Sequence, residues 1–152
     1  MCSFPVLLLA LIMSKQVGAA LSVLGSPLRP CCFAPVTGYY RDGFCSLDAS
    51  DRGSHTVCAI VTREFLNFTA SRGNDLATPR PPHFPGLQPG DKWCLCASRW
   101  LEAYDAFTSG AVQRAAVPAV VLSATNEAAL RICPVEALRA HAAVEEAAIS
   151  AT

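Results

Sequence analysis

The stretch from Asn74 to Gly90 is rich in proline and glycine, and it has neither a helical nor an alternating apolar pattern. Proline lacks a backbone N–H and fixes φ, so it ends helices and is excluded from the middle of sheets. The stretch is therefore predicted to be a long irregular loop, with regular secondary structure confined to the segments before and after it. Loops of this length in a compact domain are often functional.

Short strands and helices are predicted around this loop. Alternating apolar and β-branched residues favour strands over residues 55–61, 92–97 and 117–122. Capping residues and helical periodicity favour helices from Thr62 to Gly73, from Ser98 to Gly110, after Thr125, and from Pro134 to about His141. At 152 residues the chain suits one hydrophobic core. The prediction is a small single α+β domain, with a short sheet and about three or four helices.

The two ends of the chain differ in composition from the middle. Residues 1–20 form an apolar leader, in which residues 4–13 are too few for a membrane-spanning helix but suit the apolar core of a signal peptide. Val17 and Ala19 would supply the small residues of a cleavage site. We assign residues 21–143 to the domain and 144–152 to an alanine-rich tail. A genuine targeting signal would make the protein secreted or organellar, and without one it would be cytoplasmic.

The charges of the chain balance, with 12 basic and 12 acidic residues. No net field favours a phosphate backbone or an anionic lipid surface, so we expect no nucleic-acid partner and no peripheral membrane binding. We also expect no stable membrane span, because the apolar run at residues 4–13 is too short for one. The chain also has 8 cysteines. Cysteines at this density indicate disulfides in an oxidising compartment, and metal binding or catalysis in a reducing one.

Several segments occur in a fixed order that resembles the domain of unknown function 2237 family, a mostly bacterial group. They are residues 23–25 (VLG), 37–43 (TGYYRDG), 55–59 (HTVCA), 71–76 (SRGNDL), 78–81 (TPRP), 84–87 (FPGL) and 89–97 (PGDKWCLCA). The resemblance covers about residues 21–142, and it implies a family with no established activity. The chain departs from the family pattern at Phe44-Cys45, where members often carry paired cysteines, at Cys31-Cys32, where one is usual, and in a longer connection over residues 107–116.

The pair Cys94 and Cys96 is the sharpest chemical feature, because residues two apart on a strand point to the same face. Cys58 on a neighbouring strand would add a third sulfur, and Cys45, Cys31 or His55 would complete a tetrahedral site. Our first hypothesis is a zinc or iron ion held by Cys45, Cys58, Cys94 and Cys96. The alternative is that these cysteines are small buried residues of the sheet.

A second hypothesis is a thiol-dependent enzyme or redox protein. It needs a reactive thiolate beside a cation or an imidazole. Cys94 or Cys96 would be the nucleophile, because both precede a predicted helix, whose amino end favours negative charge. His55 would be the catalytic imidazole, and Arg99 or Arg72 would be alternative neighbours.

A third hypothesis is a module that binds an anionic small molecule through arginine side chains. Its alternative is that the same polar side chains only hold the long loop in place. The residues concerned are Arg41, Asp42, Arg72, Asn74, Asp75, Arg80 and Arg99.

Overall fold

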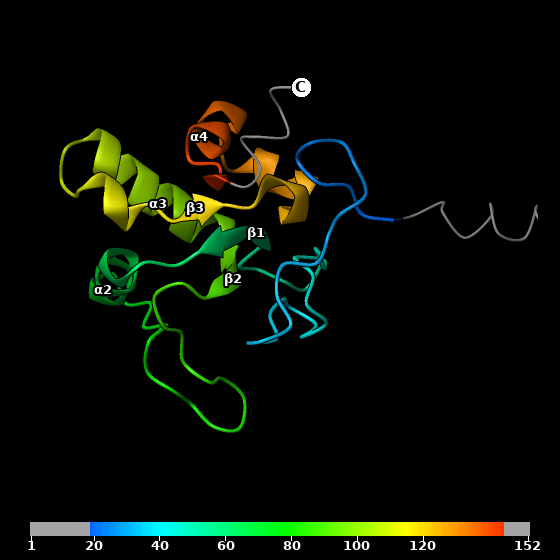
Figure 1. Cartoon of the computed structure of the whole chain (residues 1–152), viewed down its shortest axis with the longest axis horizontal. Helices are drawn as coiled ribbons and strands as arrows, with labels where there is room; N and C mark the ends of the chain where they lie inside the picture. Colours follow the sequence, from blue (N-terminus) through cyan, green and yellow to red (C-terminus); the bar gives the residue numbers. More distant parts are fainter. Residues whose placement is uncertain (1–18, 145–152) are drawn as a thin grey trace, which may run out of the picture.

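The computed structural model describes residues 19–144. Most of the predicted leader and all but the first residue of the predicted tail lie outside this range. Within it, the chain forms a three-stranded antiparallel sheet and three α-helices, which confirms the predicted α+β class (Figure 1). No helix in residues 19–144 is long and apolar enough to cross a membrane.

The sheet has the order β2-β1-β3, with β1 (His55–Ile60) in the centre. Both β2 (Lys92–Cys96) and the two-residue β3 (Ala119–Val120) pair with it in antiparallel fashion. The predicted third strand was longer, but Pro118 has no N–H to give to a ladder, so pairing begins only after it. The register of β1 with β2 shifts between His55 and Val57, which ends the strict alternation of side chains there.

Helix α2 (Arg63–Ser71) begins as its sequence predicts, because the Thr62 hydroxyl accepts a hydrogen bond from the Phe65 N–H at 3.0 Å. Helix α3 (Ala97–Thr108) starts one residue before the predicted cap Ser98. Its N-cap residue is Cys96, which makes no side-chain capping bond. The chain therefore passes from β2 into α3 with no loop between them.

The region after β3 is made of short elements. A 3-10 turn at Leu122–Ala124 precedes a 3-10 helix at Glu127–Arg131. The sequence predicted Thr125 as the cap of this helix, but the Asn126 side chain caps it. The Thr125 hydroxyl instead accepts from the Cys58 N–H at 3.1 Å. The last helix, α4 (Val135–Ala140), follows Pro134 as predicted.

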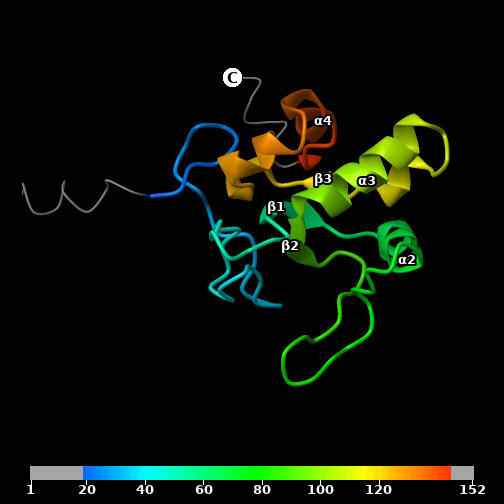
Figure 2. The same ribbon diagram turned by 180° about the vertical axis from the view of Figure 1, so that it is seen from behind.

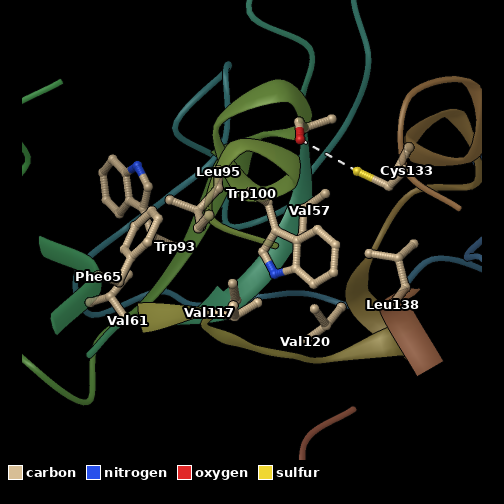
Figure 3. Close-up of a cluster of buried hydrophobic side chains, with 14 of the residues drawn as sticks. Val57, Val61, Phe65, Trp93, Leu95, Trp100, Val117, Val120, Cys133 and Leu138 are labelled. Carbon is tan, nitrogen blue, oxygen red and sulfur yellow. Dashed lines mark hydrogen bonds between the residues drawn. The ribbon is translucent and has the colours of Figure 1, made fainter. Parts of the chain in front are cut away.

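The hydrophobic core lies on the sheet face that carries Val57 and Leu95, where α3 and α4 cover it (Figure 3). Trp100 of α3 is fully buried there, and its indole N–H donates to the Pro118 carbonyl at 3.0 Å. This bond ties α3 to the start of β3. The opposite sheet face carries Cys58 and Cys94, which are register partners.

The predicted long loop is irregular, since no helix or strand occurs between α2 and β2. Both views show it extending away from the rest of the domain between the end of α2 and the start of β2 (Figures 1 and 2). Phe84 anchors it by packing edge-to-face on Trp93, with the ring centroids 5.5 Å apart. The segment before β1 lies beside the sheet (Figure 2). It brings Cys31 and Cys45 against Cys58 and Cys94, on the sheet face opposite the main core.

Candidate active site

Cys96 and His55 meet at one end of the β1–β2 ladder. They are register partners, and the Cys96 Sγ lies 3.2 Å from the His55 Nε2. Cys96 is the last residue of β2, and His55 is the first residue of β1. Antiparallel pairing of a strand start with a strand end therefore brings together two of the predicted catalytic residues, which are 41 positions apart.

Asp51 completes a hydrogen-bonded chain with this pair. Its Oδ1 lies 2.7 Å from the His55 Nδ1, while its Oδ2 accepts from the His55 backbone N–H at 2.8 Å. The carboxylate also accepts from the Gly53 N–H at 3.1 Å, and the side chain is almost wholly buried. Asp51 thus fixes both the turn before β1 and the orientation of the imidazole ring.

The His55 imidazole is held in its protonated form by these contacts. The hydrogen bond with Cys96 raises the pKa of His55 to about 9, and the charges of Cys96 and Asp51 act in the same direction, while burial opposes them. Both nitrogens of an imidazolium donate hydrogen bonds. At neutral pH the ring therefore donates to Asp51 on one side and to the Cys96 sulfur on the other.

The pair is reachable from solvent but closely confined. The His55 side chain is 36% exposed, and Cys96 is half-buried. Gly53 passes so close that a Cβ there would lie 2.7 Å from the His55 Cε1 and 2.9 Å from the Cys96 Sγ. The Tyr39 ring stacks against the imidazole, with the centroids 6.5 Å apart. Only a glycine at position 53 leaves the observed geometry undisturbed.

Cys96 also stands at the positive end of α3. The first amides of a helix have no intrahelical acceptor, and together with the helix dipole they favour negative charge at this end. Because the Cys96 side chain does not cap the helix, it leaves the first-turn amides of Ser98 and Arg99 without that acceptor. An anionic sulfur, or an oxyanion formed beside it, is stabilised in this position.

Four other cysteines form two disulfides, Cys31–Cys58 and Cys45–Cys94, on the sheet face opposite the main core. Cys94 was a candidate nucleophile with Cys96, but its sulfur is bonded to Cys45, so of the two only Cys96 carries a thiol. Three of the predicted metal ligands, Cys45, Cys58 and Cys94, do lie together. The fourth predicted ligand, Cys96, faces His55, and Cys31 takes its place in the cluster.

Two further free cysteines lie within the described residues. Cys133 is buried, and its thiol donates to the Ala97 carbonyl at 3.4 Å (Figure 3). Burial raises the pKa of Cys133 to about 12, which makes the thiol unreactive at neutral pH. Cys32 is half-buried, and its sulfur forms no hydrogen bond within residues 19–144.

The predicted anion-binding residues do not form one cluster, and each of them makes contacts in its own part of the fold. The Arg41 guanidinium lies over the Trp93 ring at 4.9 Å and donates to the Gly38 carbonyl. The Asp42 side chain accepts from the Phe44 N–H at 3.0 Å. Both side chains hold the turn over residues 38–43.

The remaining members of that set support α2, α3 and the long loop. The Arg99 guanidinium donates to Glu102 at 3.0 Å, and Arg72 lies 4.0 Å from the same carboxylate. Asn74 donates to the Thr69 hydroxyl at 2.9 Å, and the Asp75 carboxylate accepts from two amides of its own turn. Arg80 donates to the Asp75 carbonyl and lies over Phe84.

Arg72 and Glu102 also line an open surface groove of about 540 Å³ along α3. Cys96 and His55 do not line this groove, so the arginine-bearing surface and the cysteine–histidine pair are separate places on the molecule.

Asp51 is the functional residue that sequence reasoning missed. The available signal was an aspartate four residues before a histidine that opens a strand, but the polar stretch around it reads as an ordinary loop. The contact depends on a tight turn at residues 51–54, where the Ser54 N–H donates to the Asp51 carbonyl at 3.1 Å.

Comparison with protein-family models matches residues 21–142 to a family described as "Uncharacterized protein conserved in bacteria (DUF2237)". The match covers the fold and the whole of the candidate site, and it confirms the resemblance seen in the sequence segments. A search of curated proteins finds no match to the chain.

Proposed function

The chain belongs to the DUF2237 family, whose description names no activity, and on that premise we propose that it is a cysteine-dependent acyl-transfer enzyme. Cys96 is the nucleophile, His55 is the general acid and base, and Asp51 positions His55. The observation that carries the proposal is the unbroken hydrogen-bonded chain from the Cys96 sulfur through both imidazole nitrogens to a buried carboxylate.

The first half-reaction begins from the thiolate and imidazolium forms. The Cys96 sulfur attacks the carbonyl carbon of an ester, thioester or amide, which forms a C–S bond and places a negative charge on the carbonyl oxygen. The amide groups at the amino end of α3 favour this charge. The leaving group then departs with the proton of the His55 Nε2, and an acyl group remains on Cys96 as a thioester.

The second half-reaction releases the acyl group. His55, now neutral, takes a proton from a water molecule, whose oxygen attacks the thioester carbon. The C–S bond breaks, and the carboxylic acid leaves while the Cys96 thiolate and the His55 imidazolium are restored. Asp51 keeps the proton of the Nδ1 in place, so that the Nε2 is the nitrogen that exchanges protons with the reactants.

The test starts with the full chain and a reactive acyl donor, p-nitrophenyl acetate. We expect a burst of p-nitrophenol, equal to the protein concentration, and mass spectrometry should locate the acetyl group on Cys96. Cys96→Ala should abolish the burst. His55→Gln and Asp51→Asn should slow it, by roughly 100-fold or more for His55, which is the usual size of general acid–base catalysis.

Cys32 provides an internal control, because it is also a half-buried free thiol but its sulfur makes no hydrogen bond to an imidazole within residues 19–144. Cys32→Ser should leave the burst unchanged. An acetyl group that forms equally on Cys32, or a burst that survives in Cys96→Ala, would contradict the proposal.

A further inference from the structure

The second unusual feature is the group of four cysteines on the sheet face opposite the main core. Cys58 and Cys94 are register partners on β1 and β2, and the segment before the sheet brings Cys31 and Cys45 against them. All four are buried, with exposures of 7% or less. Two strands and the segment before them thus place four sulfur atoms in a single buried cluster.

The spacing of the sulfur atoms is close to that of a metal site. The Sγ atoms of Cys31, Cys45 and Cys58 all lie within 4.8 Å of one another, and the Cys94 sulfur is bonded to that of Cys45. In a tetrahedral zinc–thiolate centre, Zn–S bonds of about 2.3 Å place neighbouring sulfurs roughly 3.8 Å apart. Once the sulfur–sulfur bonds are broken, rotation of the Cys94 side chain toward the other three sulfurs would give four ligands around one ion.

The surroundings of the cluster define which ion would fit. Ala124 and Val121 pack against the sulfurs, and no imidazole or carboxylate of the described residues belongs to the group of candidate ligands. A closed set of thiolates favours zinc or iron over magnesium or calcium, which take oxygen ligands. The burial also leaves no open position for a substrate, as is typical of a structural metal centre.

Two threonine hydroxyls hold the backbone of the cluster. The Thr125 hydroxyl accepts from the Cys58 N–H at 3.1 Å, and the Thr37 hydroxyl accepts from the Cys94 N–H at 2.8 Å. These contacts do not depend on the disulfide bonds. The strand positions of Cys58 and Cys94 would therefore stay in place when the sulfur–sulfur bonds are broken.

We propose that Cys31, Cys45, Cys58 and Cys94 form a redox-controlled tetrathiolate site for one zinc or ferrous ion, and that the two disulfides are its oxidised, metal-free form. A dithiol reductant supplies two electrons and two protons to each disulfide and becomes a disulfide itself, which leaves four cysteine thiols. The divalent ion then binds the four sulfurs and displaces their four protons. In the reverse direction, two molecules of a small-molecule disulfide accept the four electrons and become thiols, which re-forms both protein disulfides and releases the ion.

The test uses the untagged full chain, reduced without oxygen and then freed of reductant. Cobalt(II) alone serves as the probe, because its visible spectrum reports tetrahedral thiolate coordination, and zinc(II) is then added to displace it. We expect one cobalt ion per reduced chain and none in the oxidised chain. Zinc should protect four thiols from alkylation, and mass spectrometry should identify them as Cys31, Cys45, Cys58 and Cys94.

Variants separate this site from the neighbouring thiols. Loss of a residue that only hydrogen-bonds to a metal ligand weakens metal binding by roughly 10–100-fold. Cys31→Ser removes a ligand itself, so it should weaken cobalt binding by more than that. Cys32→Ser, which changes the next residue along the chain, should bind normally. Cys96→Ser should also bind normally although it removes the proposed nucleophile, so the two proposals fail or succeed separately.

Three results would overturn the proposal. They are a reduced chain that takes up no cobalt, unchanged binding in Cys31→Ser, and loss of binding in Cys96→Ser. Circular dichroism covers the case in which reduction unfolds the chain. Recovery of the folded spectrum on addition of zinc supports the site, and a chain that stays unfolded with zinc present contradicts it.

Discussion

The thiol of Cys133 donates a hydrogen bond to the carbonyl oxygen of Ala97, the residue that directly follows the proposed nucleophile, at 3.4 Å. Cys133 lies just before α4, whereas Ala97 is the first residue of α3. The contact therefore links the segment that leads into α4 with the first residue of α3 (Figure 3).

Cys133 should behave as a structural residue. Burial raises the pKa of its thiol to about 12, so native protein should show no alkylation of Cys133 under conditions that label Cys96. Cys133→Ala removes a buried sulfur and should lower the free energy of unfolding by about 1–3 kcal/mol. Urea denaturation measures the loss. Rapid native labelling of Cys133 would contradict the closed packing of this thiol.

Gly53 should be essential for the geometry of the cysteine–histidine pair. In Gly53→Ala the new Cβ would lie 2.7 Å from the His55 Cε1 and 2.9 Å from the Cys96 Sγ, so the turn or the two side chains must shift from the observed geometry. We expect the rate of acetyl transfer to Cys96 to fall by roughly tenfold or more, in line with the cost of displacing catalytic groups. The burst rate with p-nitrophenyl acetate measures it.

Gly73→Ala is the matched control for that experiment. Gly73 has a φ of +81°, and no atom outside its immediate chain neighbours lies within 4 Å of the position that a Cβ would take, so the substitution strains the backbone without a clash. It should cost about 1–2 kcal/mol of stability, because a left-handed conformation is unfavourable for alanine. The burst rate should stay at the native value. An equal loss of rate in both variants would mean that the Gly53 effect is only a loss of stability.

The parts of the fold that local signals specify could be predicted from the sequence. Alternation of apolar residues predicts β1, and Thr62 predicts the start of α2, because both depend on residues close in the chain. The start of α3 differs because Cys96 ends a strand and begins a helix without a capping bond. Pairing with β1 determines that boundary, and no local residue type signals it.

The candidate site shows the same division between local and distant contacts. The sequence identifies Cys96 and His55 as reactive residue types, but their meeting depends on the β1–β2 register. The disulfide pairing joins residues 27 and 49 positions apart, so the sequence alone leaves the partners undetermined. Asp51 escapes prediction because its role depends on a turn that only the folded chain displays.

The stability of the protein should fall below neutral pH because of His141. This side chain is buried, and its ring makes T-shaped contacts with the rings of Trp100, Tyr104 and Phe107 of α3. Burial lowers the pKa of His141 below its ordinary value of 6.5, and the charge of Arg114 acts in the same direction. The unfolded chain therefore binds a proton at a higher pH than the folded chain does.

The sign of the effect follows from this difference. Above pH 6.5 the ring is neutral in both states, and its contribution to stability is complete. Below that pH the unfolded state gains a proton first, so the free energy of unfolding falls by up to about 1.4 kcal/mol per pH unit from this group. Urea denaturation between about pH 5 and 8, the range in which histidine titrates, should show a smaller slope in His141→Phe. An unchanged slope in His141→Phe would contradict the role of this side chain.

The two threonines that bind the strand amides of Cys58 and Cys94 should contribute to stability through these hydrogen bonds, and the Thr125 hydroxyl also donates to the Val121 carbonyl at 2.9 Å. Thr37 and Thr125 are fully buried, and their hydroxyls accept from the amides of Cys94 and Cys58. Valine has the same shape but no acceptor, so Thr37→Val leaves a buried N–H unsatisfied. Such a group costs about 1–3 kcal/mol, and Thr125→Val should lose at least as much, because it also removes the hydrogen bond to the Val121 carbonyl.

Thr108→Val provides the comparison, because the Thr108 hydroxyl bonds to the Asp105 carbonyl on the exposed surface of α3. Water replaces a lost partner there, so the change should stay within about 0.5 kcal/mol. Denaturation of all three variants under oxidising conditions keeps both disulfides intact and isolates the hydrogen bonds. If Thr37→Val were as stable as Thr108→Val, the amide of Cys94 would have another acceptor, and the position assigned to Cys94 on β2 would have to be revised.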